Sequence, residues 1–297
     1  MTAIPQAGQL VIRRIPFNFP SDVRPIWNAG HREWSHMVNG ASLAMPYLEP
    51  FLIHSMREAL PDVADEQVVA EARAFMAQEG QHYRTHRRYN ELLKAGGYPQ
   101  LADVEAAMDR SFTRLRAKRS LTFRLAYACG FETMTLGITR WLVDERTRLF
   151  GGSDSRVASF ILWHFVEETE HKRVAFDVYS AARGSYWPRV LGVFTGSLHV
   201  FLWSRQGCKA MLKADGKWWN LRSRLRLWLR TAEFFAAVIP GALRSLRRDH
   251  NPEDRADPAW ARDWIAGYAL LDDASQVPLV DTCQPEFPVP FPSWESL

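Results

Sequence analysis

The stretch WHFVEETEHKRVAFDVY, residues 163–179, decides the fold, because its charged residues interrupt an otherwise apolar helical face. Steps of four and three residues give a stripe that is apolar at both ends and polar in the middle: Val157, Ile161, His164, Glu168, His171, Ala175 and Val178. At 100° per residue, Glu168 and His171 lie within about 40° of His164. Glu167 lies about 60° to the other side and Glu170 about 120° away. The pattern therefore directs Glu168 inward, Glu170 toward solvent and Glu167 to the flank.

Three further segments predict helices whose core face is interrupted in the same way. They span residues 41–60, 62–94 and 120–148. The second carries Glu79 and His82 one turn apart, and the third carries Glu132 alone among small and apolar residues. The first carries Glu49, flanked by Pro46 and Pro50, so that either a kink directs it inward or the helix begins later. A fourth helix is expected from Asp154 or Ser155 to about Ala182, with the opening stretch inside it.

A buried carboxylate is costly unless it is paired or bound to a cation. Any one of these residues alone is explained by a hydrogen bond to a neighbour. Together, one Glu from each of two helices and Glu-x-x-His from each of two others match the dinuclear carboxylate site of ferritin-like bundles. The sequence thus predicts an all-α, ferritin-like four-helix bundle with a dinuclear metal centre and additional C-terminal helices. The expected ligands are Glu49, Glu79, His82, Glu132, His164, Glu168 and His171, with Glu167 as a candidate to support a ligand and no catalytic residue beyond the ligands.

The chain resembles the ferritin-like family of predicted metal-dependent hydrolases. The resemblance rests on NGASLAMPYLEPF (39–51), FMAQEGQHYRTHRRYNELL (75–93), LAYACGFETMT (125–135) and, most specifically, residues 163–179, and it continues weakly to DHNP (249–252). It implies the fold and the metal site more than the reaction. His164, one turn before Glu168, adds a third histidine and is similar to the di-iron arylamine N-oxygenases, where this spacing supplies an additional ligand. The alternative is that His164 packs against the ligands, and His86 is expected to reach solvent.

Histidine and carboxylate ligands without thiolate favour two iron ions, with manganese or a mixed Mn/Fe pair as alternatives and zinc behind them. Such a pair can activate dioxygen, so the main prediction is an oxygenase or oxidase that acts on a small organic or lipid-like anionic substrate and needs an electron donor. The alternative is a metal-dependent hydrolase that uses a hydroxide bridging the metals. A ferroxidase or a simple metal-binding protein is a further alternative.

The positive charge is concentrated in residues 183–248, which hold 13 Lys and Arg against Asp215 and Glu233, while the whole chain has a net charge of +4. A helix packed on the bundle with solvated arginines explains this stretch, as does contact with an anionic membrane surface or an acidic carrier. No nucleic-acid-binding module is recognisable, so nucleic acid is not an expected partner.

The expected organisation is an irregular lead-in (1–38), the metal-binding bundle (39–185), a basic, Trp-rich helical extension packed on it (186–272) and a Pro-rich tail (273–297). Residues 95–119 are expected to form a long connection with a short helix at 103–112, and further helices are predicted at 188–213, 217–248 and 258–271. Three scattered cysteines without CxxC spacing argue against a cysteine metal site. With no apolar leader, a cytoplasmic homodimer is expected, peripheral at the inner membrane face.

Overall fold

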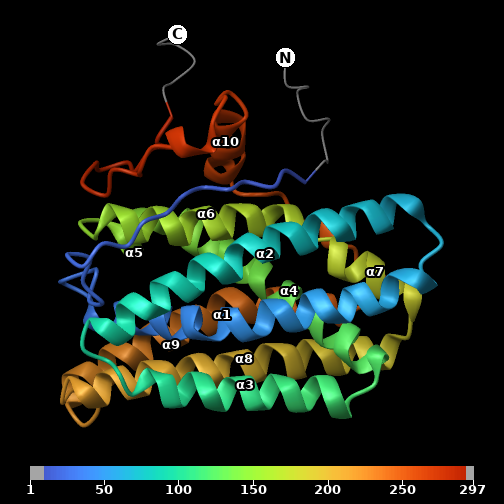
Figure 1. Ribbon diagram of the computed structural model, residues 1–297, viewed down its shortest axis with the longest axis horizontal. Coiled ribbons are helices and arrows are strands. Elements are labelled where there is room, and N and C mark those ends of the chain that lie inside the picture. The colour runs from blue at the N-terminus through green and yellow to red at the C-terminus, as the bar shows by residue number, and fades with distance from the viewer. Residues whose placement is uncertain (1–9, 292–297) are drawn as a thin grey trace.

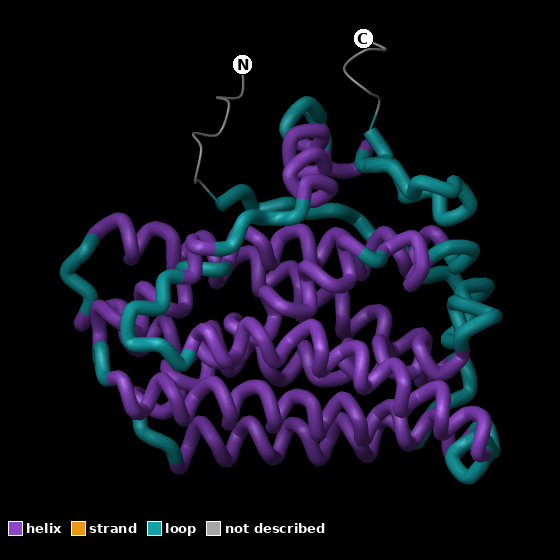
Figure 2. The backbone as a smooth tube through the Cα atoms, turned by 180° about the vertical axis from the view of Figure 1, so that it is seen from behind, coloured by secondary structure: helices purple, strands orange, loops and turns teal. Residues whose placement is uncertain are grey.

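The computed structural model describes residues 10–291, and this part of the chain is built from helices without strands (Figures 1 and 2). The prediction of an all-α protein is confirmed. The longer helices are α1 (Arg32–Ala59), α2 (Glu66–Ala95), α3 (Leu101–Lys118), α4 (Leu121–Asp144), α6 (Ser155–His171), α8 (Tyr186–Ala214) and α9 (Leu221–Ser245). Shorter helices are α5 (Arg146–Phe150), α7 (Val174–Ala182) and α10 (Ala259–Tyr268), and 3-10 turns lie at Leu60–Asp62, Pro252–Asp254 and Ala274–Gln276.

Side-chain caps fix where the helices begin. Asp65 accepts hydrogen bonds from the first amides of α2, and Ser120, Asp154 and Asn220 do the same for α4, α6 and α9. The predicted start of the fourth helix at Asp154–Ser155 is thereby confirmed. Gly97, with a φ of 114°, supplies the left-handed residue that turns the chain after α2.

The first helix is longer than predicted. It begins at Arg32 and continues through Pro46 and Pro50, so the expectation of an irregular lead-in up to residue 38 is wrong from Arg32 onward. Its first turns bury polar Glu33, Ser35 and His36 as well as Trp34. A helix enclosed on nearly all sides has no amphipathic period, and the sequence pattern therefore gave no signal.

Two of the other predicted elements also differ. Residues 95–119, expected as a connection with a short helix, contain the 18-residue helix α3, which buries only the narrow stripe Leu101, Glu105, Met108 and Phe112. The fourth helix is interrupted after His171, where residues 172–173 turn before α7. The predicted helices at 188–213, 217–248 and 258–271 agree with α8, α9 and α10 to within a few residues. The division into domains stays a prediction.

Helices α1, α2, α4 and α6 surround the polar residues, and α8 packs against α1 and α4. Glycines permit this close packing. A Cβ at Gly130 of α4 or at Gly192 of α8 would collide with backbone atoms of the opposite helix, and Gly40 of α1 faces the α8 backbone in the same way. On the opposite side, the N-terminal segment runs along α6 beneath α10 (Figure 1). None of the helices among residues 10–291 combines the length and apolar character that a membrane crossing requires.

Candidate metal centre

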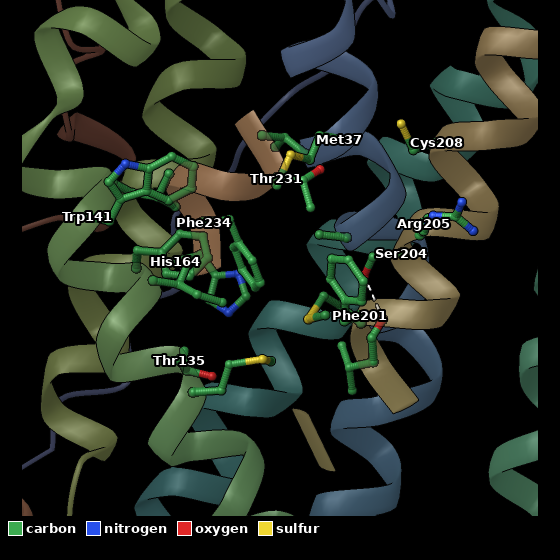
Figure 3. Close-up of a pocket in the computed structure, with 18 of the residues that line it drawn as sticks. Met37, Thr135, Trp141, His164, Phe201, Ser204, Arg205, Cys208, Thr231 and Phe234 are labelled. Carbon is green, nitrogen blue, oxygen red and sulfur yellow. Dashed lines mark hydrogen bonds between the residues drawn. The ribbon is translucent and has the colours of Figure 1, made fainter. Parts of the chain in front are cut away.

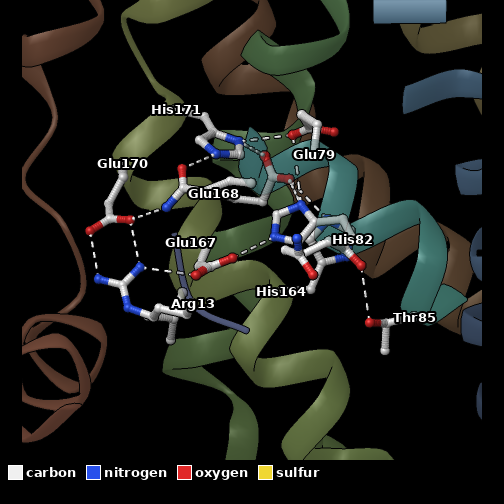
Figure 4. Close-up of polar contacts among 12 residues, drawn as sticks. Arg13, Glu79, His82, Thr85, His164, Glu167, Glu168, Glu170 and His171 are labelled. Carbon is white, nitrogen blue, oxygen red and sulfur yellow. Dashed lines mark hydrogen bonds and ion pairs between the residues drawn. The ribbon is translucent and has the colours of Figure 1, made fainter. Parts of the chain in front are cut away.

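The seven predicted ligands are buried, and none is more than 5% exposed. Six of them form sets of three whose ligand atoms lie within 4.8 Å of one another. The sets are Glu49, Glu79 and His82; Glu79, Glu168 and His171; and His82, His164 and Glu168. Glu132 belongs to none of these sets, but the charges of Glu168 and Glu79 act on its carboxyl. The structure therefore brings the predicted residues of α1, α2, α4 and α6 into one cluster. Figure 4 shows those of α2 and α6.

Atoms without hydrogen-bond partners are concentrated in this cluster. They are both carboxyl oxygens of Glu49, one oxygen each of Glu79, Glu132 and Glu168, and the Nδ1 atoms of His82 and His171. His171 Nδ1 lies 3.1 Å from Glu79 Oε1, without the alignment of a hydrogen bond. Unpartnered buried polar atoms are costly, and so many in one place are explained if a cation is their partner. Four carboxylates and three imidazoles without thiolate fit iron, manganese or zinc.

Each of the two Glu-x-x-His histidines is hydrogen-bonded through the ring nitrogen that points away from the cluster. His82 Nε2 lies 2.7 Å from Glu167 Oε2, and His171 Nε2 lies 2.8 Å from Gln78 Oε1. Since these bonds occupy Nε2, the Nδ1 atom of each ring is left facing the carboxylates. Carboxylate and carbonyl partners of this kind fix the tautomer and orientation of metal-binding histidines. Glu167 thus lies where a supporting residue was expected, whereas Gln78 was missed because it lies off the inner stripe.

Arg13 closes the site from the N-terminal segment (Figure 4). The side chain is 1% exposed and donates to Glu167 Oε1 at 3.0 Å and to both Glu170 oxygens at 2.7 and 2.8 Å. Glu170 also accepts from Gln78 Nε2 at 2.8 Å and keeps 15% exposure. The prediction that Glu170 faces solvent is wrong, because Arg13 and Gln78 bind its carboxylate and leave it 15% exposed.

A second set of hydrogen bonds ends at His164. Ser42 Oγ donates to Asn90 Oδ1 at 2.8 Å, so it accepts from His86 Nδ1 at 2.8 Å. His86 Nε2 then accepts from His164 Nδ1 at 2.7 Å, and His164 Nε2 carries a lone pair 2.9 Å from Glu168 Oε1. The expectation that His86 reaches solvent is wrong, since it is 2% exposed.

The pKa values of the buried groups in the cluster are shifted in both directions. Burial and the neighbouring carboxylates raise the pKa of Glu49 and of Glu132. Burial opposes ionisation of Glu168, but the charge of His171 outweighs it and lowers the pKa of Glu168 well below the usual value. Burial likewise opposes protonation of His82, but Glu167 and Glu79 raise its pKa to about 9. The apoprotein cluster therefore holds protons in the places where a metal would supply positive charge.

An apolar cavity of about 140 Å³ reaches the cluster between α1, α4, α8 and α9 (Figure 3). His164 and Glu168 line it together with many aromatic and aliphatic side chains, including Trp141, Phe201 and Phe234. Thr135, Ser204, Thr231 and Arg205 are among its few polar residues. The buried polar cluster therefore adjoins an apolar cavity, which is large enough to hold part of an organic molecule.

A family model described as "Predicted metal-dependent hydrolase" matches residues 11–256. No curated protein and no solved structure matches the chain. Likeness to ferritin-like proteins and to the arylamine N-oxygenases therefore stays a prediction. The matched region includes Arg13 and all seven predicted ligands, and it spans well over half of the sequence. The chain belongs to the family of predicted metal-dependent hydrolases.

Proposed function

We propose that the protein is a metal-dependent enzyme with a dinuclear centre, and that it acts on an apolar substrate in the cavity between α1, α4, α8 and α9. The proposed ligands are Glu49, Glu79, His82, Glu132, His164, Glu168 and His171, in a ferritin-like arrangement of α1, α2, α4 and α6. One observation carries the proposal. The unpartnered ligand atoms of these buried residues gather where the apolar cavity ends at His164 and Glu168.

The distances suggest how the ligands divide. Glu79 Oε1 lies 3.1 Å from His171 Nδ1 and 3.7 Å from His82 Nδ1. Glu168 lies between the same two rings, with Oε1 3.8 Å from His82 Nδ1 and Oε2 3.5 Å from His171 Nδ1. Glu79 and Glu168 would therefore help to hold a metal ion beside either histidine, and Glu49 and Glu132 would supply the remaining carboxylates.

Hydrolysis is the reaction that the family description favours. Two bound divalent ions would polarise a carbonyl oxygen and lower the pKa of water. The chain's own residues prepare this chemistry. Glu167 and Gln78 hold the two imidazoles with Nδ1 inward, and Arg13 donates a hydrogen bond to the second oxygen of Glu167. The apolar walls bind the substrate's hydrocarbon part and exclude bulk water, so an ester or amide with an apolar acyl group is the substrate class that fits.

Oxidation by dioxygen is the second candidate, and His164 favours it. Its lone pair at Nε2 faces Glu168, so an imidazole-rich ligand set is available at one of the two ions. The walls of the cavity also offer few polar groups to hold a polar leaving group, whereas they suit the hydrocarbon of an oxidisable substrate. Iron, manganese or a mixed pair would serve this reaction, with an external electron donor.

Metal loading distinguishes the two reactions. Apoprotein is loaded without oxygen with Fe(II), Mn(II) or Zn(II), and the ions bound per chain are counted. Each form is then given p-nitrophenyl esters of increasing acyl length, and oxygen uptake is followed separately with a reductant present. Ester cleavage by the Zn or Mn form without oxygen uptake supports the hydrolase. Oxygen uptake by the Fe form that an apolar compound accelerates supports the oxygenase, and failure to bind two ions overturns both.

A matched variant pair guards this experiment against contaminating activity. Glu79→Gln removes a proposed ligand and is expected to abolish both metal loading and activity. Gln67→Glu changes charge on the exposed first turn of the same helix and is expected to leave both unchanged.

A further inference from the structure

The outer side of α8 is apolar and exposed. Trp187, Leu191, Phe194, Leu198 and Leu202 follow one another at steps of four and three, and each is 48–71% exposed. No charged residue occurs between Arg189 and Arg205. A helix in water normally places charges at such positions, so this side of α8 is built for contact with something apolar.

Helix α9 continues the same surface. From Trp228 to Leu243 every exposed residue is apolar, namely Trp228, Leu229, Ala232, Phe235, Ala236, Ile239, Pro240 and Leu243. The two helices follow each other in the chain, and the ring of Phe201, beside Leu202, packs 4.9 Å from that of Phe235. The two apolar stripes therefore adjoin. We call them together the α8–α9 face.

Positive charge stands at both ends of the α8–α9 face. At the end near the α8–α9 turn are Arg205, Lys209, Lys213, Lys217, Arg222, Arg224 and Arg226, and at the other end are Arg244, Arg247 and Arg248. The acids of residues 186–248 are already held: Asp215 by His36 and Tyr98, and Glu233 by Arg230 and Arg148. Beyond them, Asp249 pairs with Arg247. The ends of the face thus attract anions.

We propose that the α8–α9 face docks on an anionic lipid bilayer. The apolar stripes would enter the boundary between headgroups and acyl chains, and the cations at both ends would contact lipid phosphates. Trp187, Trp219 and Trp228, 65–84% exposed, are the residue type that prefers this depth. A second copy of the chain is a poorer occupant. Because both ends are positive, pairing the face with itself in either direction brings like charges together.

The cavity connects this face with the proposed metal centre. Phe201, Ser204 and Arg205 of α8 and Leu227 and Thr231 of α9 line it, and all five are half-buried or exposed. The cavity therefore reaches the surface between the two helices, beside the exposed Leu202 and Trp228. An apolar substrate could pass from the bilayer to the centre without crossing water. This delivery rests on the proposed function, whereas docking itself does not.

Vesicle sedimentation tests the docking. Purified protein is mixed with vesicles of pure phosphatidylcholine or with vesicles that also contain 30% phosphatidylglycerol. The anionic vesicles are expected to bind more protein and to release it in high salt. Leu202→Glu is expected to lower binding at least tenfold. Leu270→Glu is the matched control, since both leucines are 48% exposed and Leu270 lies beyond α10. In the double variant Arg222→Gln/Arg226→Gln, vesicle affinity is expected to fall about fivefold for each charge removed. The control Arg73→Gln/Arg262→Gln is expected to keep the wild-type affinity.

Three outcomes overturn the proposal. If the protein binds equally to both vesicle types, the cations do not contribute to docking. If Leu202→Glu and Leu270→Glu lose vesicle binding to the same extent, the α8–α9 face is not the docking surface. The third outcome is a wild-type protein that does not bind vesicles and is a dimer by light scattering, while Leu202→Glu is a monomer. That result would assign the face to contact with a second copy of the chain. Metal content is measured on every variant. Normal metal content with lost vesicle binding separates a failure of docking from a failure of the proposed centre.

Discussion

His164 Nε2 lies 2.9 Å from Glu168 Oε1, and in the hydrogen-bonding pattern of the site neither atom has a proton to give the other. The proton of His164 is on Nδ1, because His86 accepts there. Burial and the nearby His82 lower the pKa of His164, so a second proton on its ring is disfavoured. Two facing acceptors repel each other unless a cation lies between them. This relationship is the strongest sign that His164 is a ligand rather than a packing residue.

The variant His164→Ala tests that assignment. We expect it to retain one metal ion per chain and to lose the other to a chelator at a concentration at least tenfold lower than for the wild type. Competition with a chromophoric chelator measures this directly. His54→Ala removes an exposed histidine from α1 and should titrate like the wild type. If His164→Ala also does so, the ring is not a ligand.

Breaking the contact of Arg13 should cost stability. Arg13→Met leaves the buried carboxylate of Glu167 and the largely covered Glu170 without their cation, and the free energy of unfolding is expected to fall by about 3 kcal/mol. Urea denaturation of the apoprotein measures it. Arg14 is the matched control because it is adjacent and exposed, and Arg14→Met should change stability by less than about 0.5 kcal/mol. Adding Glu170→Gln to Arg13→Met should restore part of the loss, and no recovery would contradict the pairing.

The inner stripe of each helix could be predicted from the sequence because it depends only on angles within one helix. His82 and Glu79 share a face whatever surrounds them. Arg13 could not be predicted, since it reaches Glu167 across 154 positions of sequence from a segment without periodicity. His86 lies on the same stripe as His82, but the arginines around it suggested solvent; those arginines occupy the other faces of α2. For polar residues off the inner stripe, such as Glu167 and Glu170, long-range contacts decide whether they are enclosed.

Metal affinity should rise with pH. Glu49 and Glu132 have raised pKa values, as do His82, at about 9, and His171, so protons must leave these groups when a metal binds. We expect apparent affinity for Zn(II) or Mn(II) to increase from pH 6 to pH 9. Calorimetry in two buffers of different ionisation enthalpy counts the protons released. An affinity independent of pH in this range, with no proton release, would show that the cluster is already deprotonated.

The apoprotein should respond to pH in the opposite sense. His82 has a folded pKa of about 9 against an ordinary value of 6.5, so its protonated form favours the folded state. The contribution is complete below about pH 6.5 and is lost as the pH rises through 9. Thermal unfolding of the apoprotein should therefore occur at a lower temperature at pH 9 than at pH 7. Glu167→Gln, which weakens the contact that raises this pKa, should flatten the dependence, and an unchanged slope would assign it to other groups.

Narrowing the cavity should change which substrates are accepted, without changing the metal centre. Ala41 of α1 lines the cavity, and Ala41→Phe places a ring in it. Each methylene of substrate that is excluded forfeits about 0.8 kcal/mol, or about fourfold in kcat/KM. With the esters used above, the variant should match the wild type on short acyl chains and fall progressively behind on longer ones, with full metal content. Ala102→Phe, on the exposed side of α3, is the control and should keep the wild-type profile. A uniform loss at every chain length would instead indicate a damaged centre, and an unchanged profile would mean that the substrate does not occupy this cavity.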